Sequence, residues 1–208
     1  MHIDKTTCWY NRNKSPEMML SGAKGILWPK LEYSDHIGVL KNLLDKIPTT
    51  EKSLLDVGCG AAELSRVFPE YFYFGADLEN TIKDVSMVMH PDANFIIFDV
   101  YESPQSCNFI AEYDIVVMNA FIDVMQYPIK ALENILMNAK KYVIIHRQEV
   151  DNNGSTRVVT NPSYGGFTYH SIINCNEFNK ILEKYNFKIL STQDLYNNSK
   201  SFLLKVTT

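Results

Sequence analysis

Two closely spaced glycines directly follow a short apolar segment, and they are the first sign of a ligand site. Leu54 to Val57 have the apolar character of a buried strand, and Gly58 and Gly60 come next, before a helical segment. Glycine has no side chain, so the backbone N–H groups of such a loop can come close to a ligand. A dinucleotide-binding loop would have a third glycine where Glu63 stands. The loop therefore indicates a ligand but counts against a pyrophosphate at the helix N-terminus.

Two aspartates stand at the expected carboxyl ends of the next two strands. Asp77 follows Gly58 at about the 20-residue spacing at which a carboxylate accepts hydrogen bonds from ribose hydroxyls. Asp99 ends the third expected strand in the same way. Parallel strands have their carboxyl ends at one edge of the sheet, where open α/β folds bind ligands. Gly58, Asp77 and Asp99 are therefore expected to lie together.

Taken together, these residues resemble the class I S-adenosylmethionine-dependent methyltransferases. The segment Asp56-Val57-Gly58-Cys59-Gly60 is similar to the first motif of that family. Asp77 is similar to its ribose-binding acid, and Asp99 to the acid near the adenine amino group. The resemblance covers roughly residues 35–208, including an expected C-terminal hairpin. Ala62 departs from the pattern, because many members have a third glycine there.

The resemblance implies S-adenosylmethionine as the cofactor and assigns residues to its parts. Gly58 and Gly60 would lie against the methionine part, and Asn119 and Ala120 would face the sulfonium. The full implied set is Asp56, Gly58, Gly60, Asp77, Leu78, Asp99, Val100, Asn119 and Ala120, of which Leu78 and Val100 would flank the adenine.

Methyl transfer to a hydroxyl group needs an aligned acceptor and a group that takes its proton. His146, at the end of an expected strand, and His170 are the candidate bases, and Asp123 is a candidate for orienting the acceptor. The alternatives are histidines that order a loop by hydrogen bonding and an aspartate at a helix start. We interpret His36 and His90 as surface or capping residues.

An unpatterned segment at 150–175 is rich in aromatic residues, asparagine and glycine. A connection of this length is usually functional or disordered, and its aromatic content favours an ordered lid over the acceptor. The residues expected to contact the acceptor are Arg147, Tyr164 and Tyr169.

The acceptor itself is the least determined part of the interpretation. The residues from Asn119 to Ile122 lack the Asn-Pro-Pro-Tyr type of motif found in amino-methylating DNA enzymes. The segment from His146 to Tyr164 loosely resembles small bacterial methyltransferases of surface-polysaccharide (capsule) biosynthesis, whose acceptors would be hydroxyls on sugars or sugar-linked groups. We therefore expect an O-methyltransferase acting on a small carbohydrate-type acceptor. The alternatives are N-methylation of a small metabolite and a nonenzymatic binding module.

The elements that must position these residues alternate along the chain. Strands are expected at 53–57, 71–75, 94–98, 114–118, 142–146, 187–192 and 201–206, and helices at 35–47, 61–68, 81–89, 128–139 and 176–185. Alternation of this kind, with continuous apolar strands, predicts an α/β, Rossmann-like sheet. The sheet is expected to have seven strands, mostly parallel, with a C-terminal antiparallel hairpin. Residues 1–34 show neither the helical nor the strand periodicity of apolar residues. They are expected to form an arm or cap before a domain at 35–208.

Length, charge and cysteine spacing limit the remaining possibilities. A chain of 208 residues with 46% hydrophobic residues is expected to form one compact soluble domain. Its net charge of −4 disfavours a nucleic-acid partner. The four cysteines have no metal-site spacing, so we expect free thiols, no metal and a cytoplasmic location. The first residues lack the charged and then apolar pattern of a signal peptide, and no apolar run approaches the length of a membrane span, so neither is expected. The protein is expected to be a monomer or homodimer.

Overall fold

A mixed β-sheet forms the centre of the molecule in the computed structural model, which describes residues 1–10, 15–27 and 29–207. Its strand order is β3-β2-β1-β4-β5-β7-β6, with β9 on β5 and β8 on β9. The parallel core consists of β1 (Ser53–Val57), β2 (Phe72–Asp77), β3 (Asn94–Ile97), β4 (Ile115–Asn119) and the long β5 (Tyr142–Asp151). The expected mostly parallel α/β sheet with C-terminal antiparallel strands, β8 (Phe187–Asp194) and β9 (Ser199–Val206), is confirmed.

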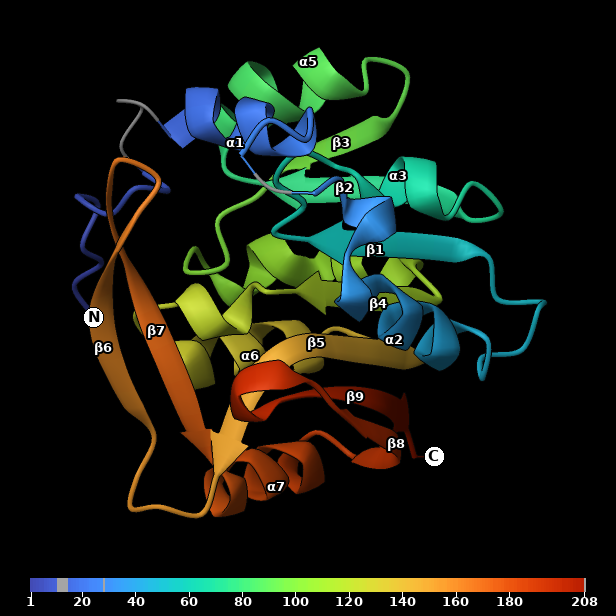
Figure 1. Cartoon of the computed structure of the whole chain (residues 1–208). Helices are drawn as coiled ribbons and strands as arrows, with labels where there is room; N and C mark the ends of the chain where they lie inside the picture. Colours follow the sequence, from blue (N-terminus) through green and yellow to red (C-terminus); the bar gives the residue numbers. More distant parts are fainter. Residues whose placement is uncertain (11–14, 28, 208) are drawn as a thin grey trace.

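The sheet has nine strands rather than the expected seven, because the 150–175 segment folds as a hairpin. Its strands are β6 (Arg157–Ser163) and β7 (Gly166–Asn174), and β7 pairs with the end of β5 in parallel. The two-residue turn Tyr164-Gly165 has positive φ at both positions, as hairpin turns of this length require. Figure 1 shows this hairpin at one side of the sheet, next to the N-terminal residues.

Helices cover both faces of the sheet, as Figure 1 shows for α2 in front and α6 behind. The helices are α1 (Ser15–Ala23), α2 (Asp35–Leu44), α3 (Leu64–Val67), α4 (Glu79–Thr81), α5 (Met87–Met89), α6 (Pro128–Leu136) and α7 (Cys175–Lys184). The 3-10 helices are η1 (Leu31–Tyr33), η3 (Pro104–Glu112), η4 (Ile122–Val124) and η5 (Tyr196–Asn198), and η2 (Ile82–Ser86) is a π-helix. Within the described residues, no helix has the length and apolar character that a membrane crossing requires.

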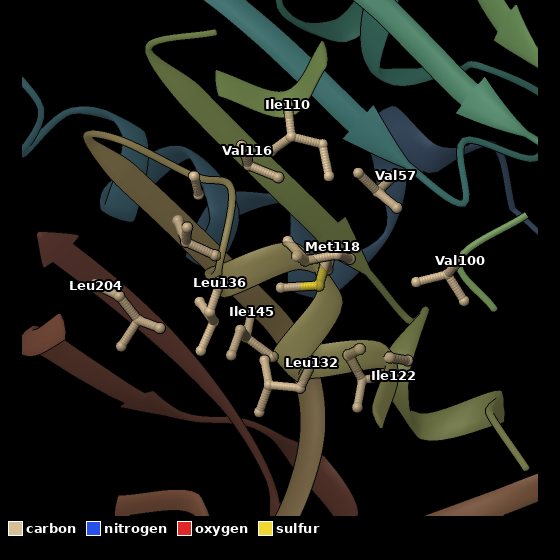
Figure 2. Close-up of a cluster of buried hydrophobic side chains, with 14 of the residues drawn as sticks. Val57, Val100, Ile110, Val116, Met118, Ile122, Leu132, Leu136, Ile145 and Leu204 are labelled. Atoms are coloured by element: carbon tan, nitrogen blue, oxygen red, sulfur yellow. The ribbon is translucent and has the colours of Figure 1, made fainter. Parts of the chain in front are cut away.

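Alternate side chains of β4 enter two separate hydrophobic cores. Ile115 and Val117 pack with α2 and α3, whereas Val116 and Met118 pack with α6 on the opposite face. This follows from the two-residue period of a strand, and it explains why β4 is apolar without interruption. Figure 2 shows Met118 at the centre of the second core, which the sheet, α6 and η4 enclose.

The N-terminal residues lie along the β6–β7 hairpin and are tied to it by specific hydrogen bonds. The Cys8 backbone N–H donates to the Phe167 carbonyl at 2.8 Å, and Trp9 Nε1 donates to Thr168 Oγ1 at 2.8 Å. Asn80 Nδ2 donates to the Trp9 carbonyl at 2.8 Å. These contacts make residues 1–10 a wall against the carboxyl ends of the strands.

Candidate ligand site at the carboxyl ends of the strands

One large cavity of about 710 Å³ opens at the carboxyl ends of the parallel strands. The ends of β1, β2 and β4, the loops after β1, β2, β3 and β4, and Arg147 of β5 form its floor. Residues from the N-terminal segment, α1, the start of α2 and the hairpin enclose it. This volume is within the range typical of small-molecule pockets. The position is the one at which open α/β sheets bind ligands.

The loop after β1 needs glycine because of a neighbouring ring. Gly58 and Gly60 have φ of +73° and +53°, in the left-handed region that favours glycine. A Cβ atom on Gly58 would also collide with the ring of Phe121, from the loop after β4. The loops after β1 and β4 therefore approach each other so closely that a side chain at position 58 would collide with Phe121.

Asp77, the last residue of β2, holds this loop in place. Its Oδ2 accepts the Gly60 backbone N–H at 2.9 Å, and its Oδ1 accepts the Leu78 N–H at 2.7 Å. Burial raises the pKa of Asp77, and these two backbone donors oppose that shift because they stabilise the carboxylate. Its carboxylate is thus fixed at the cavity wall next to the glycine loop.

Asp99, after β3, is in contact with the N-terminal segment. Tyr10 Oη donates to the two carboxylate oxygens at 3.1 and 3.2 Å, and the Tyr101 N–H donates to Oδ1 at 2.9 Å. Burial and the Asp99 charge raise the pKa of Tyr10, so its hydroxyl stays protonated and remains a donor.

Two further polar groups distinguish the floor of the cavity. Asp56 is 3% exposed and accepts a hydrogen bond from Tyr73 Oη at 2.9 Å, and burial raises its pKa to about 7. Asn119 Oδ1, at the end of β4, is buried without a hydrogen-bond partner among the residues described. A buried acceptor of this kind is costly unless a donor reaches it, and here it belongs to a residue of the cavity wall.

The sequence-predicted residues separate into two groups in the structure. All nine proposed cofactor residues line the cavity, and so do Arg147, Tyr164 and Tyr169. The three proposed catalytic residues, His146, His170 and Asp123, are not among the residues that line it. Their roles, like those of the lining residues, stay predictions.

His146 was expected at the rim, but its side chain is 1% exposed in the interior. The reason is that β9 pairs with β5 beside this residue, and His146 Nδ1 lies 2.7 Å from Ser201 Oγ of β9. His170 instead faces Glu149, with 3.2 Å between Nε2 and Oε2. Burial raises the pKa of Asp123 to about 6, although the charges of Arg147 and His170 oppose that shift.

His36 is a cavity residue to which sequence reasoning gave no role at the site. It was interpreted as a surface or capping residue, yet it is 6% exposed and lines the cavity from the start of α2. Its Nδ1 lies 3.1 Å from His146 Nε2, and its Nε2 lies 3.5 Å from Arg147 Nη1. The only sequence signal was its place at the first turn of a predicted helix, directly after the arm.

No cluster of three or more His, Cys, Asp or Glu side chains suited to a metal ion occurs among the described residues. All four cysteines are free thiols.

A sequence profile described as a methyltransferase domain matches residues 34–192. No curated protein matches the chain in sequence. Among solved structures, S-adenosylmethionine-bound CalS10 from Micromonospora echinaspora, an amino pentose methyltransferase of calicheamicin biosynthesis, has a TM-score of 0.59 at 11% identity. That match covers 86% of this chain and 92% of CalS10.

Two further structures have the same fold at similarly low identity. Streptomyces venezuelae DesVI has a TM-score of 0.59 at 13% identity, with 100% of both chains covered. Magnesium protoporphyrin IX methyltransferase from Synechocystis PCC 6803, solved with bound S-adenosylhomocysteine, has a TM-score of 0.56 at 15% identity, with 82% of this chain and 81% of that chain covered.

Proposed function

Because the chain belongs to the methyltransferase domain family, and is therefore an S-adenosylmethionine-dependent methyltransferase, we propose that it methylates a hydroxyl group on a small carbohydrate-type acceptor. The observation that carries this proposal is the single cavity at the strand ends, which holds all nine cofactor candidates and the three acceptor candidates. The cofactor candidates thus line one part of the cavity, and the acceptor candidates add aromatic rings and a guanidinium to its wall.

The residues present fit the cofactor. Asp77 would accept hydrogen bonds from the ribose hydroxyls, and Asp99 would face the adenine amino group. The unpaired Asn119 Oδ1 supplies an acceptor for a donor of the bound molecule, since it has no partner among the described residues. When bound, the cofactor supplies an activated methyl group on a positively charged sulfur.

Tyr164, Tyr169 and Arg147 would recognise the acceptor. Tyr164 lies against Trp9 of the N-terminal segment, with 5.0 Å between the ring centroids, so the hairpin and the segment form one aromatic wall. Aromatic faces with polar edges suit a ring-shaped polar acceptor. We therefore propose that residues 1–34 and the hairpin within 150–175 act together in acceptor recognition.

The charge of the cavity disfavours a nucleic-acid acceptor. The lining includes several carboxylates, such as Asp4, Asp35 and Glu63, and Arg147 is its only lysine or arginine among the residues described. A site that follows a phosphate backbone would instead need several cations. A small molecule is the acceptor class that this wall favours.

N-methylation of a small metabolite is the second candidate, and one observation favours it. CalS10, which has the same fold, is an amino pentose methyltransferase, and an amino sugar would suit the same polar, aromatic wall. A role in capsule or other surface-polysaccharide biosynthesis, in the cytoplasm, belongs to the proposal and depends on the looser sequence resemblance alone.

Calorimetry with S-adenosylhomocysteine, followed by a turnover assay on a panel of sugars, sugar nucleotides and amino sugars, tests the proposal. We expect saturable binding of the demethylated cofactor and methyl transfer to hydroxyl acceptors. Transfer only to amines would favour the second candidate, and binding without transfer to any acceptor would favour a nonenzymatic binding module. A folded protein that does not bind at millimolar ligand would contradict the cofactor assignment.

A further inference from the structure

His36 and Arg147 meet on the acceptor side of the cavity although they are far apart in the sequence. His36 comes from the first turn of α2, and Arg147 comes from β5, directly after His146. We infer that these two residues form an acceptor subsite for a hydroxyl compound that carries an anionic group, in which Arg147 binds the anion and His36 Nε2 accepts the hydroxyl proton. The inference rests on the proposed function and narrows its acceptor class.

Arg147 is suited to an external anion. It is the one lysine or arginine among the described lining residues, and its only hydrogen-bond contact there is the long one to His36. The Asp123 carboxyl is affected by the Arg147 charge, but no hydrogen bond joins the two in the part of the chain described. A half-buried guanidinium with free donors is a fork that matches a carboxylate or phosphate.

The backbone at Arg147 supports this assignment. Its φ is +68°, a left-handed conformation that is unfavourable for residues other than glycine. The same residue interrupts the β5–β9 register between Ile145 and Gln148. A bulge of this kind redirects side chains at a strand end, and here the redirected side chain reaches the cavity.

Arg147 also determines which nitrogen of His36 holds the proton. A guanidinium has donors only, so the His36 nitrogen that faces it, Nε2, must be the unprotonated one. The proton of neutral His36 is then on Nδ1, which donates to His146 Nε2 at 3.1 Å. His146 must in turn carry its proton on Nδ1, which donates to Ser201 Oγ at 2.7 Å. The series Ser201–His146–His36 therefore keeps Nε2 of His36 unprotonated, with its lone pair facing the Arg147 guanidinium.

The charges around His36 link its basicity to the anion. Burial lowers the pKa of His36 to about 4, and the Arg147 charge adds to the shift while Asp35 opposes it. An anion paired with Arg147 would offset that positive charge, so His36 would become a better base when the acceptor is bound. His146, the remaining titratable neighbour, is held neutral by its own burial.

The proposed step balances without a further reactant. The acceptor oxygen forms its bond to the methyl carbon as the carbon–sulfur bond breaks, and sulfur keeps that electron pair. The hydroxyl proton passes to His36 Nε2 and then to solvent. His146 is a positioning residue in this scheme, because it holds the His36 ring through Nδ1.

Calorimetry on the S-adenosylhomocysteine complex tests the anion subsite with three probes: D-glucuronate, D-glucose 6-phosphate and D-glucose. We expect at least one anionic sugar to bind about 10-fold or more tightly than glucose. Arg147→Gln should remove this difference and Arg147→Lys should keep part of it. The control, Arg157→Gln, changes an arginine of β6 that pairs with Asp151 outside the cavity and should behave as wild type. The preferred anion identifies a carboxylate or a phosphate acceptor.

The His36 half of the inference is tested by NMR titration of the ¹⁵N-labelled histidine rings. We expect His36 and His146 to be neutral at pH 7 with the proton on Nδ1, and the pKa of His36 to rise when the anionic probe binds to wild type but not to Arg147→Gln. Equal binding of all three sugars, or a probe-bound His36 with an unchanged pKa, would overturn the inference. S-adenosylhomocysteine binding is measured in the same samples, so its absence would point to failure of the proposed function instead.

Discussion

The Nδ1 atom of His36, a residue that lines the cavity, lies 3.1 Å from the Nε2 atom of His146, which is buried and does not line it. The two residues are 110 positions apart, one on α2 and one on β5. Burial lowers the pKa of His36 to about 4 and that of His146 to about 3, so both are neutral at pH 7. The contact at pH 7 is thus a hydrogen bond between two neutral rings.

Acidification should therefore destabilise the protein through this pair. Below about pH 6.5 the histidines of the unfolded chain bind protons, while His36 and His146 in the folded chain stay neutral until about pH 4 and 3. Since the unfolded state then binds more protons, stability falls as pH falls, by about 1.4 kcal/mol per pH unit for each histidine. Urea unfolding between pH 7 and 4.5 measures this slope.

Other groups titrate in the same window, so the readout is the difference between variants. The raised pKa values of Asp56 and Asp123, about 7 and 6, act in the opposite direction, because these carboxyls bind protons in the folded state first. His146→Gln replaces the titrating imidazole by an amide that does not titrate but can still hydrogen-bond, and the stability of this variant should depend less on pH than that of wild type. His2→Gln, at an exposed position, is the control. If stability changed with pH equally in wild type and His146→Gln, His146 would bind protons to the same extent in the folded and unfolded states, which would contradict the prediction.

Substitution of Asp77 should weaken cofactor binding more than it weakens the fold. Asp77→Asn replaces a carboxylate that accepts the Gly60 and Leu78 N–H groups, and one amide oxygen can keep only part of this arrangement. We expect affinity for S-adenosylhomocysteine to fall about 10- to 100-fold, the range for loss of a charge-assisted hydrogen bond. Calorimetry measures the effect, and Asp84→Asn, at an exposed position of η2, should bind as wild type. Equal affinity of the two variants would remove Asp77 from the cofactor site.

The sequence was sufficient to predict the five strands of the parallel core and the acids at their ends, because both depend on local patterns. β1 and β4 are continuous apolar segments, and Asp77 and Asp99 follow strands whose direction the alternation with helices already determines. Topology then brings these acids to one cavity. The nine-residue helix α1 was missed, since its sequence has no strong helical period, and only packing against η2 and the cavity makes it a wall.

Contacts between distant segments were beyond sequence reasoning. Nothing local indicates that His36 would face His146, because the contact arises only when α2 packs beside the end of β5. The hairpin was also missed, although Tyr164-Gly165 is a turn that suits a two-residue loop. Its strand β6 is largely exposed and polar, so it lacks the alternation of buried and exposed residues that identifies a strand.

A methyl group added at Gly58 should be far more harmful than one added at Gly38. Gly58→Ala places a Cβ against the Phe121 ring at a φ of +73°, and we expect a loss of about 1–3 kcal/mol of stability and weaker cofactor binding. Gly38, in α2, has no atom within 4 Å of the added carbon. Gly38→Ala should stabilise the helix by about 0.5–1 kcal/mol. Thermal unfolding of both variants checks the pair, and equal effects would contradict the close approach of the β1 and β4 loops.

The attachment of the N-terminal segment to the β6–β7 hairpin should depend on Thr168. This residue is 7% exposed, and its Oγ1 accepts the Trp9 Nε1 hydrogen bond at 2.8 Å. Thr168→Val keeps the shape of the side chain but leaves the indole N–H without that partner, at a cost of about 1–3 kcal/mol confined to the segment. Hydrogen exchange of the Cys8 amide, which donates to the Phe167 carbonyl, should become about 10-fold faster or more. Thr160→Val, at an exposed position of β6, is the matched control. If both variants exchange the Cys8 amide at the wild-type rate, the segment is held by its other contacts, and Thr168 has no part in forming the acceptor wall.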